Sequence, residues 1–499
     1  MSEYTSFKLA ACLRPMKKTV LNTTLFACMA LLVFAMGSCK EDTISTDPND
    51  FLAFSTDTLQ FDTVFTSVGS VTRDFLIYNN ADQPVVISNI RIAGGESSRF
   101  RMNVDGIPGS DQDGIEVPAN DSVWVFVEVT IDPNSDFLPY VVEDSIIFMT
   151  NGNTQNVLLV AWGQNANFLS GQRICDEVWV DDLPYVIYNY IQVDSNCTLT
   201  ILEGCRVHFH ANSGILVDGT LLVEGQADSM VVFEGDRLEG FFNDQPGQWD
   251  GIYLLRGSIG NSFENCVIKN SVDGIAAGFT KSPNLSDFNA SNMPEATLNN
   301  VTIHDITGNG IIALLAKIDA TNVQIFNVGS YNAALLMGGD YRFNHSTLAN
   351  YGSFFLNHQT PVIGISNFFN FGQDENGADV IIESDLVKAE FINSIIEGNI
   401  IEGKELSLAD FENTASFNHQ FTNCMIRTER ELTSFNNTNC IINQDPIFTS
   451  RSNNDYTLFE GSPAIDAGIS SASILDILNN PRPFSGTLPD MGAFESGYE

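Results

Sequence analysis

Acidic side chains in close spacing are the first residues of this sequence that could take part in catalysis. Asp181 and Asp182 are adjacent, and Asp273 and Asp305 each come shortly after an Asn-containing apolar segment. Neighbouring carboxylic acids can protonate a leaving oxygen and activate water, which is the chemistry of glycoside hydrolysis. Acids at turns more often hydrate a loop, and Asp181-Asp182 precedes the repeats described below. We therefore assign no catalytic residue.

Histidines and basic residues offer the other candidates for chemistry. His208 and His210 flank Phe209, so in a strand both rings point to one face and could bind a metal ion. No third ligand is indicated nearby, and we interpret both as packing or surface residues. The basic residues of the second half that could serve as a lyase base are Arg206, Arg237, Arg256, Lys269, Lys317, Arg342, Lys388, Lys404 and Arg427. None lies in a motif that we can match to a lyase active site.

Aromatic residues could bind sugar rings by stacking. Trp249 lies in the segment Trp249-Asp-Gly-Ile and is interpreted as a core residue rather than a sugar platform. Tyr331, Tyr341 and Tyr351 recur every ten residues. That spacing does not match the repeat of the chain, so the signal for a sugar-binding face is weak.

An internal repeat then predicts the elements that position these side chains. An Asn followed three residues later by an aliphatic residue recurs, with His345 at the Asn position in one copy, and the Asn copies are Asn265, Asn300, Asn322, Asn393 and Asn423. The shortest interval, 22 residues, suits one turn of a β-solenoid. We interpret the 48 residues between His345 and Asn393 as two turns.

The solenoid explains why Asn recurs. Each turn lays its strands on those of the turn below at about 4.8 Å, so equivalent residues stack in columns. An Asn at a bend can hydrogen-bond to its copies and to the turn backbone. We therefore predict that the five Asn residues form a structural ladder, and that loss of folding on mutating two of them would support this role.

Residues 51–166 follow a different pattern. Short alternating segments such as Ser122-Val-Trp-Val-Phe-Val-Glu-Val are separated by clusters of Gly, Pro, Asn and Asp. Six or seven such strands predict an antiparallel β-sandwich. The segments resemble the Ig-like domains of the ASPM/SPD-2/Hydin type, which are usually spacer or binding modules.

The N-terminal region predicts the location of the protein. Lys17 and Lys18 precede an apolar run that ends in Gly37-Ser38-Cys39. This resembles a bacterial lipoprotein signal peptide (residues 1–38), cleaved before Cys39, whose thiol and amine are then acylated. The Lys-Glu-Asp that follows resembles the surface-export signal of Bacteroidetes lipoproteins, and residues 39–50 would form the lipidated tether. Met16 is an alternative start.

The chain from about residue 170 to residue 499 resembles a known superfamily. Leu199–Gly225 and Trp249-Asp-Gly-Ile look like the first coils of right-handed parallel β-helix proteins of the pectate-lyase-like superfamily. The run 455–468 with Pro489-Asp-Met-Gly-Ala-Phe-Glu495 is similar to the segment that closes many bacterial surface β-helix proteins. We thus expect an all-β chain: a sandwich, a right-handed parallel β-helix over 168–450, and a C-terminal cap over 451–499.

Composition limits the partners. The net charge is -39, with the acids dispersed, which disfavours nucleic acid and anionic lipid. No Cys/His spacing suits zinc. Outside the cytoplasm, Cys197–Cys205 or Cys424–Cys440 could form disulfides, and buried free thiols are an equal alternative.

These observations lead to one functional expectation and one alternative. We expect an outer-membrane lipoprotein facing the cell exterior, anchored to the membrane only through its lipid. It would be non-catalytic and would bind extracellular polysaccharide or mediate adhesion to a surface protein. The alternative is a divergent polysaccharide lyase or glycoside hydrolase, which the resemblance alone implies. No cofactor is expected, although carboxylates could hold Ca²⁺.

Overall fold

The computed structural model describes residues 43–66, 69–132, 140–280, 288–374, 376–400, 403–411 and 414–497. Within these ranges the regular structure is strand, with short 3-10 turns and no α-helix. The expected all-β fold class is therefore confirmed. The 3-10 turns are η1 (Gly95–Ser97), η2 (Gly240–Phe242), η4 (Ala290–Asn292), η6 (Leu432–Ser434) and η7 (Arg451–Asn453). None of the described helical turns is long and apolar enough to cross a membrane.

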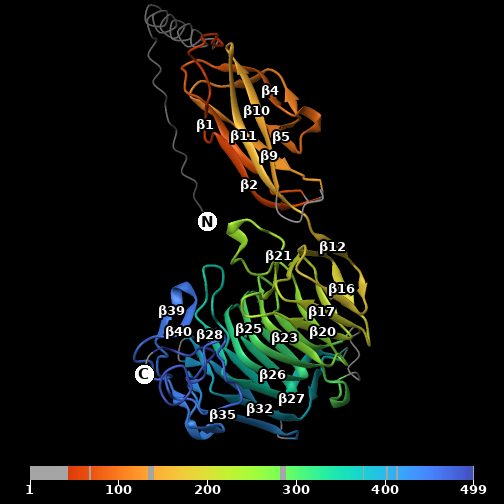
Figure 1. Cartoon of the computed structure of the whole chain (residues 1–499), viewed down its shortest axis with the longest axis vertical. Coiled ribbons are helices and arrows are strands. Elements are labelled where there is room, and N and C mark those ends of the chain that lie inside the picture. Colours follow the sequence, from red (N-terminus) through yellow and green to blue (C-terminus); the bar gives the residue numbers. More distant parts are fainter. Residues whose placement is uncertain are drawn as a thin grey trace, which may run out of the picture. The chain divides into compact units, whose positions relative to one another are not determined.

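The chain divides into two compact units, and the first is a β-sandwich (Figure 1). One sheet has the order β1-β3-β9-β5-β6, and the other has the order β2-β11-β10-β4-β7 with β8 beside β4. The strands are β1 (Ala53–Phe54), β2 (Thr58–Phe65), β3 (Arg73–Asn79), β4 (Val85–Ile92), β5 (Phe100–Val104), β6 (Ile107–Pro108), β7 (Asp111–Gln112), β8 (Ile115–Val117), β9 (Asp121–Val129), β10 (Tyr140–Thr150) and β11 (Asn153–Gln164).

Strict alternation of side chains forms the sandwich core. In β9 the residues at 123, 125, 127 and 129 are buried valines, and the residues between them face outward. Phe75 and Phe148 come from opposite sheets and their ring centroids lie 6.2 Å apart. This part of the fold follows from the two-residue period of a strand with one buried face. Closer likeness to an Ig-like domain stays a prediction.

The second unit is a parallel β-helix built from three sheets. Sheet 1 contains β12 (Asn167–Ser170), β15 (Tyr185–Tyr188), β18 (Arg206–Phe209), β21 (Val231–Gly235), β28 (Thr347–Asn350), β33 (Ile395–Gly398), β36 (Met425–Ile426) and β38 (Ile441–Ile442). Sheet 2 contains β13 (Arg173–Ile174), β16 (Tyr190–Val193), β19 (Gly214–Val217), β22 (Gly251–Leu255), β24 (Ile275–Phe279), β29 (Ile363–Ser366) and β34 (Leu406–Ala409). Sheet 3 contains β14 (Glu177–Trp179), β17 (Thr198–Leu202), β20 (Thr220–Glu224), β32 (Leu386–Ile392), β35 (Phe417–Thr422) and β37 (Asn437–Thr438).

Four longer strands bend from one sheet into the next. They are β23 (Asn261–Lys269), β25 (Glu295–Ile306), β26 (Ile311–Val328) and β27 (Ala333–Asn344). Asn265 and Asn300 lie at the corners where β23 and β25 pass from sheet 3 to sheet 1. Both have positive φ, 47° and 55°, a conformation that Asn tolerates better than other non-glycine residues.

Columns of identical or similar apolar side chains fill the β-helix. Phe343, Phe391 and Phe421 come from successive coils, and their rings stack with centroids 5.0 and 5.1 Å apart. Each of the three is fully buried. The stacking follows from the parallel register, which pairs Phe343 with Phe391 and Phe391 with Phe421.

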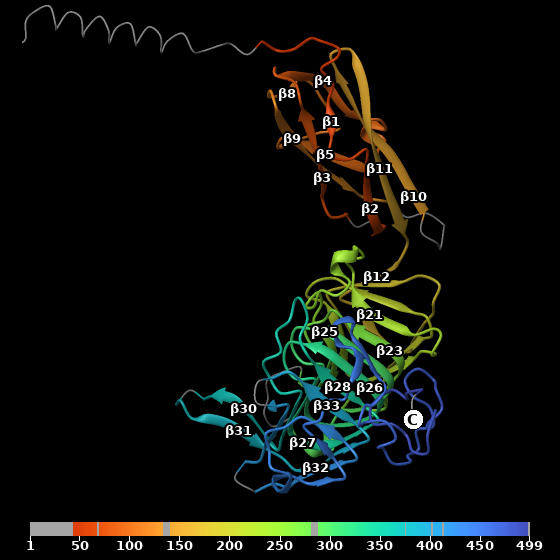
Figure 2. The same cartoon turned by 90° about the vertical axis from the view of Figure 1, so that its left-hand side faces the viewer.

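The spacing of 48 residues between His345 and Asn393 is one coil, so the interpretation as two turns was wrong. β28 pairs directly with β33, with Thr347 opposite Ile395. The additional length forms a loop at 351–362 and a hairpin of β30 (Phe368–Gln373) and β31 (Asp379–Glu383). Figure 2 shows this hairpin standing out from the β-helix, and Phe369 and Ile382 pack against a cluster at its base.

The C-terminal segment packs along the side of the β-helix. Its strands β39 (Phe448–Ser450) and β40 (Asp455–Leu458) form a small antiparallel pair. Its apolar residues cover the outward face of sheet 1, where Tyr456 and Phe494 join a cluster with Phe326 and Ile395. The segment therefore covers a flank that spans several coils, in dark blue beside β28 in Figure 1.

Candidate functional site

The predicted ladder residues lie in one row at the corner between sheets 3 and 1. Asn300 Nδ2 donates to Asn265 Oδ1 at 3.1 Å, and Asn322 Nδ2 donates to Asn300 Oδ1 at 2.9 Å. All five predicted Asn residues and His345 have φ between 47° and 55°. The residue type is thus suited both to the backbone conformation and to side-chain bonding between coils.

His345 replaces Asn in the row without breaking it. Asn393 Nδ2 lies 2.9 Å from His345 Nε2. Burial lowers the pKa of His345 to about 3, so the ring is neutral at physiological pH and Nε2 can accept this bond. Asn439 occupies the next position after Asn423 and has φ of 52°. It was not among the predicted ladder residues, although Asn439-Cys-Ile-Ile442 carries the same pattern.

The C-terminal segment covers this row by direct hydrogen bonds. Asn322 Nδ2 donates to Leu475 O, and Asn393 both donates to Ile469 O and accepts from Ile469 N at 2.8 Å. Asn423 Nδ2 donates to Ala467 O at 2.9 Å. The Asn side chains therefore bind the C-terminal segment to the coils as well as joining the coils.

A groove runs where this segment meets the outward face of sheet 3, and we name it the ladder groove. Its cavity volume is about 470 Å³. It is lined by Glu264, Thr297, Leu298, Asn299, Asn300, Asp319, Thr321, Asn322, Arg342, Asn344 and the segment Ala472–Leu475. Ile474, with 72% of its surface exposed, forms an apolar wall opposite the polar floor.

The floor of the groove repeats along the helix axis. The parallel register places Glu264, Asn299, Thr321 and Asn344 in one column, one residue per coil. Hydrogen-bonding groups therefore recur at about the 4.8 Å spacing of stacked strands. An extended polymer lying along the axis would meet Glu264, Asn299 and Thr321 in turn, whereas Asn344 at the end of the column is buried.

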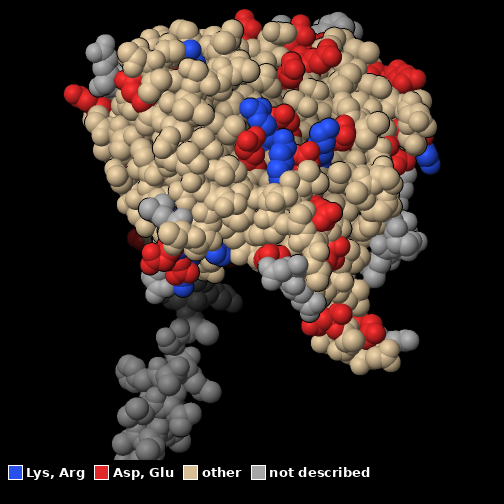
Figure 3. Space-filling model, turned by 90° about the horizontal axis from the view of Figure 1, so that it is seen from below, with Lys and Arg blue, Asp and Glu red and all other residues tan. Residues whose placement is uncertain are grey.

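The guanidinium that lines the groove, that of Arg342, is paired. Arg342 lies between two acids of the neighbouring coils, with Nη1 3.6 Å from Asp319 Oδ1 and Nε 3.4 Å from Glu390 Oε2. Figure 3 shows one face of the β-helix, where Lys and Arg lie among Asp and Glu rather than in a patch of one sign. The Arg342 guanidinium is therefore occupied by two carboxylates.

The other acids considered from the sequence have structural partners. Asp273 Oδ1 accepts from Asn309 N at 2.8 Å, so it organises a turn. Asp305 is buried, and its carboxylate bonds to His304 and to Asn327. Asp182 Oδ1 accepts from the backbone amide of the next residue, Leu183, at 2.7 Å. Neither Asp273 nor Asp305 lines the ladder groove.

The two histidines each pair with an acid of the next coil. His210 Nδ1 lies 2.7 Å from Asp236 Oδ2, and His208 Nδ1 lies 3.7 Å from Glu234 Oε1. Glu234 also pairs with Lys269, whose Nζ lies 2.9 Å from Glu234 Oε2. Among the described residues, no group of three or more His, Cys, Asp and Glu side chains is arranged to hold a metal ion.

The aromatic candidates are mostly core residues. Trp249 is buried, stacks on Phe209 at 3.9 Å and donates to Lys269 O. Tyr341 is fully buried, and its hydroxyl donates to Gly338 O. The suggestion that Tyr341 stacks on sugars is therefore wrong, because at this position the side chain points into the core.

The cysteines differ from both pairings that we considered. Cys175 and Cys197 form a disulfide across 22 residues, which leaves Cys205 as a buried free thiol. The pair Cys197–Cys205 was thus wrong. Cys424 and Cys440 are free and lie next to each other on adjacent coils. Cys39, the predicted lipidation site, lies outside the described residues.

Comparisons with known proteins add little about this site. No protein-family model and no curated protein matches the sequence. Among solved structures, a catalytic domain of a GH87 α-1,3-glucanase in complex with tetrasaccharides is 11% identical over 71% of this chain and 81% of its own, with a TM-score of 0.20. The catalytic unit of a thermostable GH87 α-1,3-glucanase from Streptomyces thermodiastaticus is 10% identical over 70% of this chain and 79% of its own, with a TM-score of 0.19.

A family 123 glycoside hydrolase from Clostridium perfringens is 12% identical over 25% of this chain, with a TM-score of 0.17. This chain spans about a quarter (26%) of the length of that enzyme. Likeness at this level carries no argument about activity. The assignment of the β-helix rests on the strand pairing of this chain itself.

Proposed function

We propose that this protein is a surface-anchored lipoprotein that binds a neutral extracellular polysaccharide along the ladder groove without cleaving it. The supporting observation is the column of polar side chains that recurs along the groove, facing the apolar wall of Ile474 and Leu475. Sugar chains present hydroxyls on their edges and C–H groups on their faces, so a polar floor and an apolar wall suit them. The lipid anchor at Cys39 is part of the proposal.

A second candidate, a glycoside hydrolase, has one observation in its favour. Asp319 and Glu390 lie on the same outward face as Glu264, so carboxylates do gather near the groove. Hydrolysis needs one acid to protonate the leaving oxygen and another to activate water. The carboxyls of Asp319 and Glu390 are instead taken up in ion pairs with Arg342, so neither is held in position to protonate a leaving oxygen.

Retention and product formation separate the two functions. The chain from residue 43 to 499 is incubated with neutral and uronate-containing polysaccharides, with and without Ca²⁺, and both bound protein and new reducing ends are measured. We expect retention on a neutral polymer without products. Products would overturn the non-catalytic proposal, and absence of both retention and products would overturn binding.

Two variants locate the binding. Asn299→Ala and Asp319→Ala remove polar groups from the groove floor and should each weaken retention several-fold. Lys388→Ala is the matched control, because Lys388 lies on the same outward face, pairs with Asp340 and does not line the groove. Equal retention of all three variants would place binding elsewhere on the chain.

A further inference from the structure

The outward face of the sandwich sheet β1-β3-β9-β5-β6 presents an open pair of aromatic side chains. Trp124 and Phe126 on β9 are 47% and 39% exposed, although large apolar side chains are usually buried in a sandwich. Their ring centroids lie 6.0 Å apart with an angle of 15° between the planes. They therefore form one near-parallel surface rather than two isolated residues.

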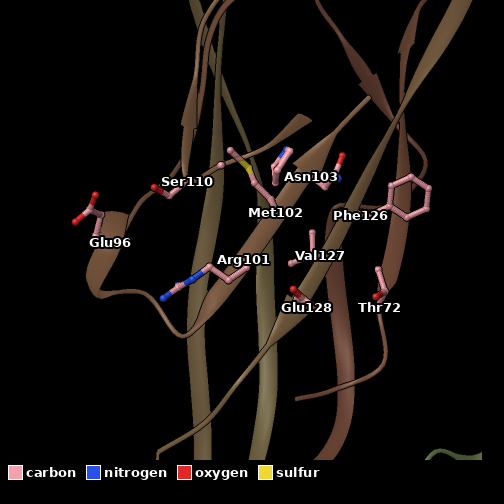
Figure 4. Close-up of a pocket in the computed structure, with 11 residues that line it drawn as sticks. Thr72, Glu96, Arg101, Met102, Asn103, Ser110, Phe126, Val127 and Glu128 are labelled. Carbon is pink, nitrogen blue, oxygen red and sulfur yellow. The ribbon is translucent and has the colours of Figure 1, made fainter. Parts of the chain in front are cut away.

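A groove of about 860 Å³ adjoins Phe126, a volume within the range of small-ligand sites. Its polar walls come from Thr72, Arg101, Asn103, Ser110 and Glu128. Figure 4 shows Phe126 on one side of this space, with Arg101 and Glu96 on the other. One groove thus combines an aromatic face with hydroxyl, amide, guanidinium and carboxylate groups.

Asn103 has an unsatisfied hydrogen-bonding atom in this groove. The register of β5 and β9 places Asn103 directly opposite Phe126. Its Oδ1 is buried and has no hydrogen-bond partner. A buried acceptor without a partner is costly, so a ligand donor that reached Asn103 from the groove would lower that cost.

The charges of the groove select among ligands. The lining holds two acids, Glu96 and Glu128, and one guanidinium, that of Arg101, so it carries more negative than positive charge. The chain as a whole carries a net charge of -39. Both facts disfavour a polyanion. An uncharged sugar chain can stack a ring face on an aromatic side chain while its hydroxyls donate to Asn103 and to the carboxylates.

We propose that this face of the sandwich is a second, separate glycan-binding site, which takes an uncharged oligosaccharide across Phe126 and Asn103, with Trp124 extending the aromatic surface. The site rests on the proposed function only in that the ligand is again a polysaccharide. It does not depend on the ladder groove.

The test is calorimetric titration of the chain 43–499 with neutral hexasaccharides of glucose and mannose, alongside a hexagalacturonate. Phe126→Ala and Asn103→Ala should each weaken binding about tenfold at this site, the size expected for a central contact. Leu158→Ala is the control, an exposed truncation on the other sheet of the sandwich. The fluorescence of Trp124 is obtained by subtracting the signal of the Trp124→Phe variant from that of the wild type. Its quenching by iodide should decrease when the oligosaccharide binds.

The outcomes separate this site from the ladder groove. Weaker binding in Phe126→Ala and Asn103→Ala, with wild-type binding in Leu158→Ala, supports the inference even if Asn299→Ala has no effect. Wild-type binding in both Phe126→Ala and Asn103→Ala overturns it while leaving the ladder groove untouched. Binding of hexagalacturonate alone, or a dimer in sedimentation that Phe126→Ala makes monomeric, also overturns it. Circular dichroism checks that each variant is folded.

Discussion

At the scale of single residues, the Asn ladder combines two requirements that only a few side chains meet. Each position has a left-handed backbone, and each side chain bridges coils or binds the C-terminal segment. Gly would suit the backbone but could not bridge, and Ala would do neither. This explains why Asn recurs at these corners and why His, with a neutral ring, can replace it once.

Asn393→Ala tests this double role. Asn393 is fully buried and contacts both His345 and Ile469, so truncation should lower the free energy of unfolding by about 2–4 kcal/mol. Asn393→Gly, which keeps the backbone relaxed, should be less destabilised. Urea unfolding followed by circular dichroism measures both.

The control is Asn212→Ala, because Asn212 has φ of 57° but an exposed side chain. It should show the backbone effect alone. The structural role of the ladder is wrong if Asn393→Ala loses no more unfolding free energy than Asn212→Ala does. It is also wrong if Asn393→Ala keeps its stability and loses only glycan binding.

Much at this scale could be predicted from the sequence, and what failed has a physical reason. The Asn pattern marks the corners because a left-handed bend restricts residue type. The burial of Tyr341 and the disulfide partner of Cys197 could not be predicted, because both depend on which residues of the adjacent coil lie next to them. Insertions such as the hairpin after β29 change the length of a coil without changing its register.

At the scale of elements, a buried ionisable group lies in the coils close to where the C-terminal segment covers them. Glu397 is buried beside Arg427, which donates to it through Nε. Tyr351, Asp445 and Arg451 surround this pair, and Arg451 lies 4.7 Å from the Tyr351 ring. Burial raises the pKa of Glu397 to about 7, although Arg427 opposes the shift.

This shift predicts how stability depends on pH. Because the folded pKa is above the unfolded value, the protonated acid stabilises the fold at pH below about 4.5, and this contribution is lost as pH rises through about 7. The melting temperature of the wild type should therefore fall more between pH 5 and pH 8 than that of Glu397→Gln.

The comparison between variants is needed because His345 acts in the opposite direction. Its lowered pKa makes the fold less stable as pH falls below about 6.5. Glu429→Gln, an exposed acid on a nearby loop, is the control and should keep the wild-type profile. Parallel profiles for wild type and Glu397→Gln would contradict the assignment.

The first coils are held together by the disulfide Cys175–Cys197. A thiol assay on the denatured chain 43–499 should find four thiols without reductant, from Cys205, Cys266, Cys424 and Cys440, and two more after reduction. Cys175→Ser should cost about 3 kcal/mol of stability, as expected for a closed loop of this length. Two thiols before reduction would instead indicate a second bond, between Cys424 and Cys440.

At the scale of the whole molecule, the sequence predicted the β-helix but could not predict where its grooves lie. The repeat marks one corner of each coil, and stacking then fixes the sheets. The ladder groove depends on residues 472–475 lying beside residues 264–344, a pairing over long sequence separation. Local patterns carry no information about such a contact, so Arg342 and Asn299 could not be recognised as neighbours of Ile474.

A solenoid should also distribute stability from coil to coil. Phe343 stacks on Phe391 and is fully buried, so Phe343→Ala should cost about 3–5 kcal/mol. Because each coil contacts mainly its neighbours, hydrogen exchange should accelerate in the strands that hold Phe391 and Phe421 and change little around Phe209 and Trp249 in the first coils. Uniform acceleration through all coils would mean that the β-helix unfolds as one cooperative block, and that its stability is not a sum of neighbouring contacts.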